Sequence, residues 1–223
     1  MSDNGTPDRR RPFSLRTSRM EAFSDGIFAI ASTLLVLDLT VPPVGPDVAQ
    51  KLHEQWPIYL AYLVSFLSIG QAWLNHSVIT EYLDRADPIL LRLNLVLLFF
   101  VSLLPFPTHM LAEYLNNESA ERIAVTVYGL NLLAISGFTS ILWHYAVAEH
   151  LVREGDREGD VRALTSKLDP SLASYAVAIG LGLLRPRAAV ALYLAIALFV
   201  IIPFRAVIRL IRRGRARDLT GQD

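Results

Sequence analysis

Two side chains that can carry a charge lie within long apolar stretches of this sequence. Asp25 follows Ser24 near the start of an apolar run that ends at Pro42 and Pro43, and His76 lies late in a second run. A charge surrounded by lipid is costly, so an ionisable residue in such a run faces protein or water and indicates a functional site. An imidazole titrates near neutral pH, so this pair suits proton transfer. The same two side chains could instead lock neighbouring helices together through hydrogen bonds.

Other polar residues extend this pair into a predicted cluster. If the two runs cross a membrane in opposite directions, the start of the first lies at the same depth as the end of the second. Trp73 and His76 are three residues apart and share a helix face. Arg19 and Asp25 are six residues apart, about 240° around a helix, so each is expected to reach a neighbouring helix. The predicted cluster comprises Arg19, Ser24, Asp25, Trp73, Asn75 and His76.

Helix locking is the default interpretation of this cluster, because interhelical hydrogen bonds of about 0.6 kcal/mol each are common in membrane proteins. Proton transfer through Asp25 and His76 is the alternative. A metal site at His76 would need a second ligand at metal-binding spacing, and the sequence offers none. The chain has no cysteine, no G-x-S-x-G motif and no phosphate-binding G-x-x-x-x-G-K-[ST] loop, so we expect neither an enzyme nor a bound cofactor.

The elements that position these residues are predicted to be membrane-spanning helices. The chain is 52% hydrophobic, and its apolar residues gather into runs close to the length of about 20 residues that crosses a bilayer. We predict an all-α fold with six spans. These are Glu21–Val41, Trp56–Thr80, Pro88–Leu111, Ile123–Ala148, Leu172–Leu184 and Ala188–Arg205. The fifth is short for a crossing, so its helix tilts little, starts earlier or sits shallow in the membrane.

Prolines and charged residues predict what interrupts and connects the spans. Pro105 and Pro107 predict a kink in the third span, whose freed carbonyl groups then need other partners. The acidic stretch Arg153–Asp160 lacks the ligand spacing of an EF-hand, so it is interpreted as a solvated loop.

The distribution of arginine and lysine predicts the orientation in the membrane. Most of these residues occur in the N-terminal arm, in the loops after the second and fourth spans, and in the C-terminal tail. The other connections carry only Lys51, Arg122, Arg185 and Arg187. By the positive-inside rule, both termini of this predicted cell-membrane protein are cytoplasmic.

We expect three regions in the chain. They are a flexible cytoplasmic arm over 1–18, a six-helix transmembrane domain over 19–207 and a basic cytoplasmic tail over 208–223. The tail is expected to contact anionic lipid. No nucleic-acid partner is expected, because no recognisable binding module accompanies the basic residues.

One stripe of the first span has the spacing of a continuous helix face. Ile30, Thr33, Leu34 and Leu37 recur at positions i, i+3, i+4 and i+7. The other faces of this helix are also apolar, so periodicity alone assigns the stripe equally well to the core, to lipid or to a pore. If several copies of the helix met on an axis, Ile30 would form an apolar ring, and such rings can gate ion flow by dewetting.

The motif Arg19-x-x-x-Phe23-Ser24-Asp25-Gly26 resembles the R-x-x-x-F-S-D-G signature of the transmembrane protein 175 family, the endolysosomal potassium channels and their prokaryotic relatives. The likeness continues through FAIASTLLVLDL, and the later motifs WLNH and LPFPT follow in the family's order. It is strongest over the first three predicted spans. One unit of six spans resembles the prokaryotic form, whereas animal members join two such units in one chain.

The resemblance implies a homotetramer in which the first span of each subunit lines a central pore for potassium ions. It implies that Ile30 forms the main constriction, with Thr33, Leu34 and Leu37 in the adjacent layers. It also implies a network that holds the first span in place, formed by Arg19, Phe23, Ser24 and Asp25 together with Trp73 and His76.

The resulting hypothesis is a potassium-permeable cation channel. An apolar ring cannot replace the water shell of an ion as carbonyl groups do, so only modest selectivity over sodium is expected. Two alternatives stay open from the sequence. One is a proton-permeable channel or proton-coupled transporter that uses Asp25 and His76, and the other is a membrane scaffold that conducts no ions.

Overall fold

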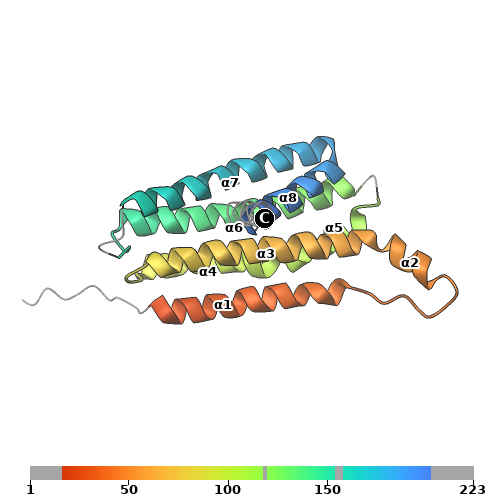
Figure 1. Ribbon diagram of the computed structural model, residues 1–223, viewed down its shortest axis with the longest axis horizontal. Helices are drawn as coiled ribbons and strands as arrows, with labels where there is room; N and C mark the ends of the chain where they lie inside the picture. Colours follow the sequence, from red (N-terminus) through yellow and green to blue (C-terminus); the bar gives the residue numbers. More distant parts are fainter. Residues whose placement is uncertain (1–16, 118–119, 154–157, 202–223) are drawn as a thin grey trace, which may run out of the picture.

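The computed structural model describes residues 17–117, 120–153 and 158–201, and this part of the chain is helical, with a single isolated β-bridge between Leu83 and Val152. The helices run side by side along one axis of the molecule (Figure 1). They are α1 (Thr17–Leu34), the 3-10 helix η1 (Leu35–Asp38), α2 (Val48–Glu54), α3 (Trp56–Tyr82), α4 (Pro88–Leu103), α5 (Pro105–Tyr114), α6 (Glu121–Ala148), α7 (Glu158–Leu184) and α8 (Pro186–Ile201). The predicted all-α fold is confirmed.

The first four predicted spans have clear counterparts among the described residues. The segments long and apolar enough to cross a membrane are Thr17–Asp38, Trp56–Tyr82, Pro88–Tyr114 and Glu121–Ala148. Two shorter apolar segments follow, Leu172–Leu184 and Pro186–Phe199. The predicted arm, the end of the sixth predicted span and the basic tail lie outside the described residues.

The fifth predicted span is the apolar part of a longer helix, because α7 begins at Glu158. The interpretation of Arg153–Asp160 as a loop is therefore wrong at its end, and the helix includes the segment before Leu172. Leu164 in this segment is buried, and Trp143 Nε1 of α6 donates a hydrogen bond of 2.9 Å to Thr165 Oγ1. The alternative that the helix of the fifth span starts earlier is therefore confirmed, and hydropathy alone does not locate the start because this half of the helix has no long apolar run.

The predicted kink in the third span is present where α4 ends at Leu103 and α5 begins at Pro105. The Leu104 amide donates to Val101 O at 3.2 Å, one residue short of its α-helical partner, Phe100 O. The Phe100 carbonyl instead accepts a hydrogen bond of 3.1 Å from Asn131 Nδ2 of α6. A neighbouring helix therefore supplies the partner that the kink requires.

Candidate functional site

Helix α1 lies at one edge of the bundle, against α3 and α4, while α7 lies at the opposite edge (Figure 1). The side chains that face the bundle recur every three or four residues, as one face of an α-helix requires. The buried residues of α1 and η1 are Met20, Ser24, Phe28, Ala31 and Leu35.

The opposite face of this segment carries the predicted pore residues, and all four are exposed. Ile30 is 58% exposed and Leu37 is 73% exposed, and Leu34 and Thr33 lie on the same open side. The Thr33 hydroxyl donates a hydrogen bond of 2.9 Å to Ile30 O, which ties its side chain to the helix backbone. This stripe is an apolar surface that the rest of the described protomer leaves uncovered.

A buried chain of hydrogen bonds joins the inner face of α1 to α4 and α3. His76 Nε2 donates to Asn94 Oδ1 at 2.8 Å, Asn94 Nδ2 donates to Ser24 Oγ at 3.0 Å, and Ser24 Oγ donates to Met20 O at 2.8 Å. The proton lies on Nε2 because an amide oxygen only accepts. Ser24, His76 and Asn94 are each at most 2% exposed. The His76 ring also lies 5.5 Å from the ring of Phe28.

Asp25 and Trp73 form a second and separate contact between α1 and α3. Trp73 Nε1 donates a hydrogen bond of 2.9 Å to Asp25 Oδ1 at the exposed side of the two helices. Both residues line a groove of about 450 Å³, whose other lining residues are Phe28, Ala29, Ser32, Phe66, Ile69 and Gly70. Asp25 and His76 therefore take different hydrogen-bond partners, because Asp25 joins α1 to α3 and His76 joins α3 to α4.

The structure places four members of the predicted cluster in these two separate contacts and leaves Arg19 and Asn75 apart from them. Arg19 is exposed, as is its motif neighbour Phe23, and Arg19 forms no ion pair with any other residue in the described part of the chain. Asn75 lines a cavity on another side of α3. It is adjacent to His76 in sequence, and the turn of about 100° per residue in a helix sends the two side chains to different neighbours.

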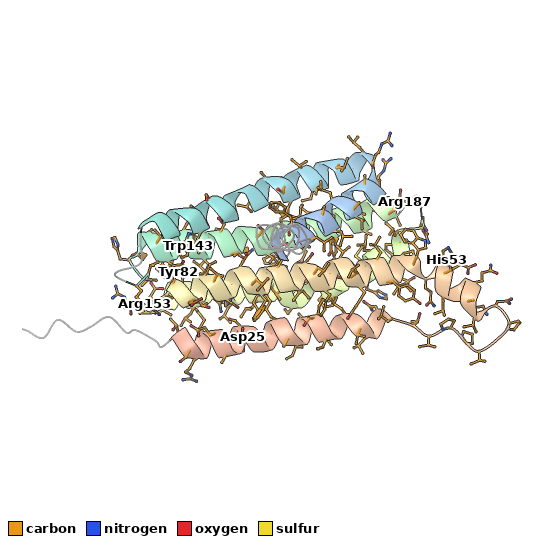
Figure 2. All side chains as sticks on the ribbon, in the orientation of Figure 1. Asp25, His53, Tyr82, Trp143, Arg153 and Arg187 are labelled. Atoms are coloured by element: carbon orange, nitrogen blue, oxygen red, sulfur yellow. The ribbon has the colours of Figure 1, made fainter. Side chains whose placement is uncertain are left out.

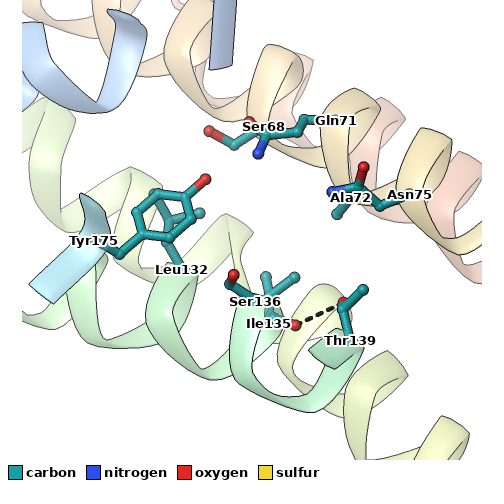
Figure 3. Close-up of a pocket in the computed structure, with 9 residues that line it drawn as sticks. All are labelled: Ser68, Gln71, Ala72, Asn75, Leu132, Ile135, Ser136, Thr139 and Tyr175. Atoms are coloured by element: carbon teal, nitrogen blue, oxygen red, sulfur yellow. Dashed lines mark hydrogen bonds between the residues drawn. The ribbon is translucent and has the colours of Figure 1, made fainter. Parts of the chain in front are cut away.

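The cavity beside Asn75 is small, is lined by polar and apolar side chains, and lies between α3, α6 and α7 (Figure 3). Its volume is about 20 Å³, enough for about one water molecule. Gln71 is 4% exposed, and its Oε1 atom has no hydrogen-bond partner among the described residues. The polar side chains that line the cavity are Ser68, Gln71, Asn75, Ser136, Thr139 and Tyr175.

Sequence reasoning missed Asn94, which connects Ser24 to His76. The signal was present, because a polar amide lies in the middle of the apolar span Pro88–Leu111 and needs partners there. It also missed the contact between His109 Nδ1 and Asp38 Oδ1, which are 3.0 Å apart and join α5 to η1. Depth matching predicts that the first two spans share a cluster, but it does not indicate which side chains of α4 and α5 reach their neighbours.

No group of three or more metal-binding side chains comes together within the residues that the structure describes.

Comparisons with known proteins agree on one family. The family described as "Endosomal/lysosomal potassium channel TMEM175" matches residues 19–105. A potassium channel from Streptomyces collinus is 42% identical over 168 residues, which cover 74% of this chain and 82% of that protein. An endosomal/lysosomal proton channel TMEM175 from Gallus gallus is 34% identical over 143 residues, which cover 60% of this chain and 28% of that protein.

A solved structure supports the same relationship. The crystal structure of a lysosomal potassium-selective channel TMEM175 homolog from Chamaesiphon minutus superposes with a TM-score of 0.75 at 37% sequence identity. The match covers 82% of this chain and 95% of that chain.

Proposed function

The chain belongs to the TMEM175 family of cation channels, and from this premise we propose that it forms a potassium-permeable channel in the cell membrane. The observation that carries the proposal is the exposed stripe along α1 and η1, which includes Ile30, Thr33 and Leu37. Lipid or further copies of the chain would cover such a face. The relationship to potassium channels favours further copies, arranged around a conducting axis.

In the proposed channel, four copies of the chain place α1 around a common axis. Ile30 forms the main constriction, and Thr33, Leu34 and Leu37 form the layers beside it. Leu37 lies about 12 Å from Ile30 along the axis, at a rise of about 1.5 Å per residue to Leu34 and about 2.0 Å per residue in η1. An ion crossing these apolar rings loses part of its water shell and gains no carbonyl ligands, so the channel favours potassium over sodium only modestly.

The contacts behind α1 are proposed to set the rotation of the helix about its own axis. The buried chain through Asn94 and the exposed pair of Asp25 and Trp73 hold two different sides of α1. Two such attachments fix which residues face the proposed pore. Their proposed role is therefore positioning, and the permeating ion need not touch them.

Substitution of Ile30 by asparagine tests the constriction. We expect Ile30→Asn to raise the potassium conductance of reconstituted protein and to lower its selectivity over sodium. The reason is that the asparagine amides would hold water in the constriction, so that ions keep more of their water shell. Val36→Asn is the matched control, since Val36 is 48% exposed on another side of the same segment. Potassium and sodium currents that stay the same in Ile30→Asn would overturn the assignment of the constriction.

A proton-permeable channel is the second candidate, and the name of the Gallus gallus relative favours it. The geometry gives a direct relay between Asp25 and His76 little support, because each is hydrogen-bonded to a different residue. Reversal potentials measured across a pH gradient separate the two candidates. A reversal potential that follows the proton gradient and shifts in His76→Gln would favour proton conduction through this site.

A further inference from the structure

Three arginines surround a cleft at one end of the helix bundle. Arg122 comes from the first turn of α6, and Arg185 and Arg187 lie on either side of Pro186, where α8 begins. The cleft has a volume of about 620 Å³, and Glu121 and Ala188 complete its lining. Arg187 lies at the opposite end of the molecule from Arg153 (Figure 2).

Positive charge in this cleft is only partly balanced. Glu121 is the one acidic side chain in the lining, and its Oε2 atom lies 3.8 Å from Arg187 Nε, beyond hydrogen-bond distance. The Arg187 side chain is 65% exposed and the two atoms are far apart, so the pair does not hold the guanidinium strongly. Arg122 and Arg185 are also exposed. Guanidinium groups in such a position can each give two parallel hydrogen bonds to a phosphate.

Apolar surface lies directly beside the charged cleft. Leu183 and Leu184, which precede Arg185, are 54% and 77% exposed. Ile123, which follows Arg122, is 58% exposed. The cleft therefore lies where apolar helix segments end, and a ligand that suits both surfaces has an anionic head and apolar chains.

We propose that this cleft binds an anionic phospholipid, with the phosphate among the three arginines and the acyl chains along Leu183, Leu184 and Ile123. Basic pockets between membrane-spanning helices bind phospholipid headgroups at the cytoplasmic side of membranes, and this cleft offers the same chemistry at the end of the bundle that the positive-inside rule places outside. The site is separate from the proposed pore stripe of α1, so it stands whether or not the proposed constriction is correct.

Lipid retention measured by native mass spectrometry tests this site. The full-length protein, purified in detergent, is titrated with phosphatidylglycerol or with phosphatidylcholine of the same acyl chains. We expect tighter binding of phosphatidylglycerol, weakened about tenfold or more in R122Q/R185Q/R187Q, because hydrogen bonds between charged groups are lost. Lys51→Gln, which removes a cation outside the cleft, is the matched control and should change nothing. Equal binding of both lipids, or unchanged binding in the triple variant, would overturn the proposal.

Two further arms separate lipid binding from a damaged fold and from the binding of free phosphate. Glu121→Gln removes the competing carboxylate, so it should strengthen phosphatidylglycerol binding, an increase that a damaged fold would not produce. Excess inorganic phosphate should leave the bound lipid in place, because it lacks the acyl chains. Full displacement by inorganic phosphate would instead assign the cleft to free phosphate and overturn the lipid proposal.

Discussion

Asn94 connects three helices because its amide both accepts and donates. Its oxygen accepts from His76 and its nitrogen donates to Ser24, so one side chain on α4 satisfies a residue on α3 and another on α1. The net contribution of a buried hydrogen bond to stability is small. Removing one partner costs more, because it leaves a buried polar group unpaired. The importance of this amide follows from geometry that no single stretch of sequence contains.

We expect Asn94→Leu to lower the midpoint of thermal unfolding of the purified protein. The variant leaves the buried N–H of His76 without an acceptor, a loss of about 1–3 kcal/mol. Ser24 still donates to Met20 O, so His76 accounts for most of the effect. Scanning fluorimetry in detergent measures the midpoint.

A double variant distinguishes a lost partner from general damage to packing. His76→Phe combined with Asn94→Leu removes both ends of the bond, so we expect the double variant to lose less stability than the sum of the two single variants. Losses of stability that simply add would show that the two side chains are energetically independent. That result would contradict the interpretation of these hydrogen bonds as one coupled unit.

At the scale of helices, the sequence predicts the bounds of helices that are apolar throughout. It does not predict the bounds of a helix that is apolar over only part of its length. The predicted span Trp56–Thr80 begins where α3 begins and ends two residues before α3 ends, because charged residues and prolines delimit the apolar run. An earlier start of α7 is among the alternatives that the short fifth span predicts, but its position at Glu158 is not predicted, because the first half of α7 is mostly polar. Asn75 was grouped with His76 because depth in the membrane follows from topology, whereas the direction of a side chain depends on helix packing.

The kink between α4 and α5 allows a test of the hydrogen bond that Asn131 of α6 donates to Phe100 O of α4. We expect Asn131→Leu to lower the thermal stability of the protein, because Phe100 O loses its donor in a region without water. The expected cost is about 1–3 kcal/mol. Scanning fluorimetry measures it, as for the Asn94 variants.

Pro105→Ala is the informative partner of that substitution. An alanine restores the amide that proline lacks, so the Leu104 amide can return to Phe100 O as a continuous helix requires. The loss caused by Asn131→Leu should therefore be smaller in the Pro105→Ala background. An equal loss in both backgrounds would mean that Asn131 does not act through the freed carbonyl.

At the scale of the whole molecule, charged residues mark the two ends of the bundle, and an exposed apolar surface marks one of its edges. Along its axis, Arg153 lies at one end and Arg187 at the other, as the count of basic residues in the predicted loops requires (Figure 2). Across the axis, α1 forms one edge and presents an uncovered apolar stripe (Figure 1). The sequence supplied both sets of residues, but only the packing of α1 by α3 and α4 shows which of its apolar faces is left for another molecule.

The orientation in the membrane is open to a direct test because the chain has no cysteine. Val44→Cys places a thiol at a fully exposed position in the loop between η1 and α2, and Arg153→Cys places one after α6. The positive-inside rule puts the second position in the cytoplasm and the first outside, since few basic residues accompany Val44. A membrane-impermeant maleimide should therefore label Val44→Cys in intact cells and Arg153→Cys only after permeabilisation. Labelling of both positions from the outside would contradict the odd number of crossings between them, and the reverse pattern would invert the proposed topology.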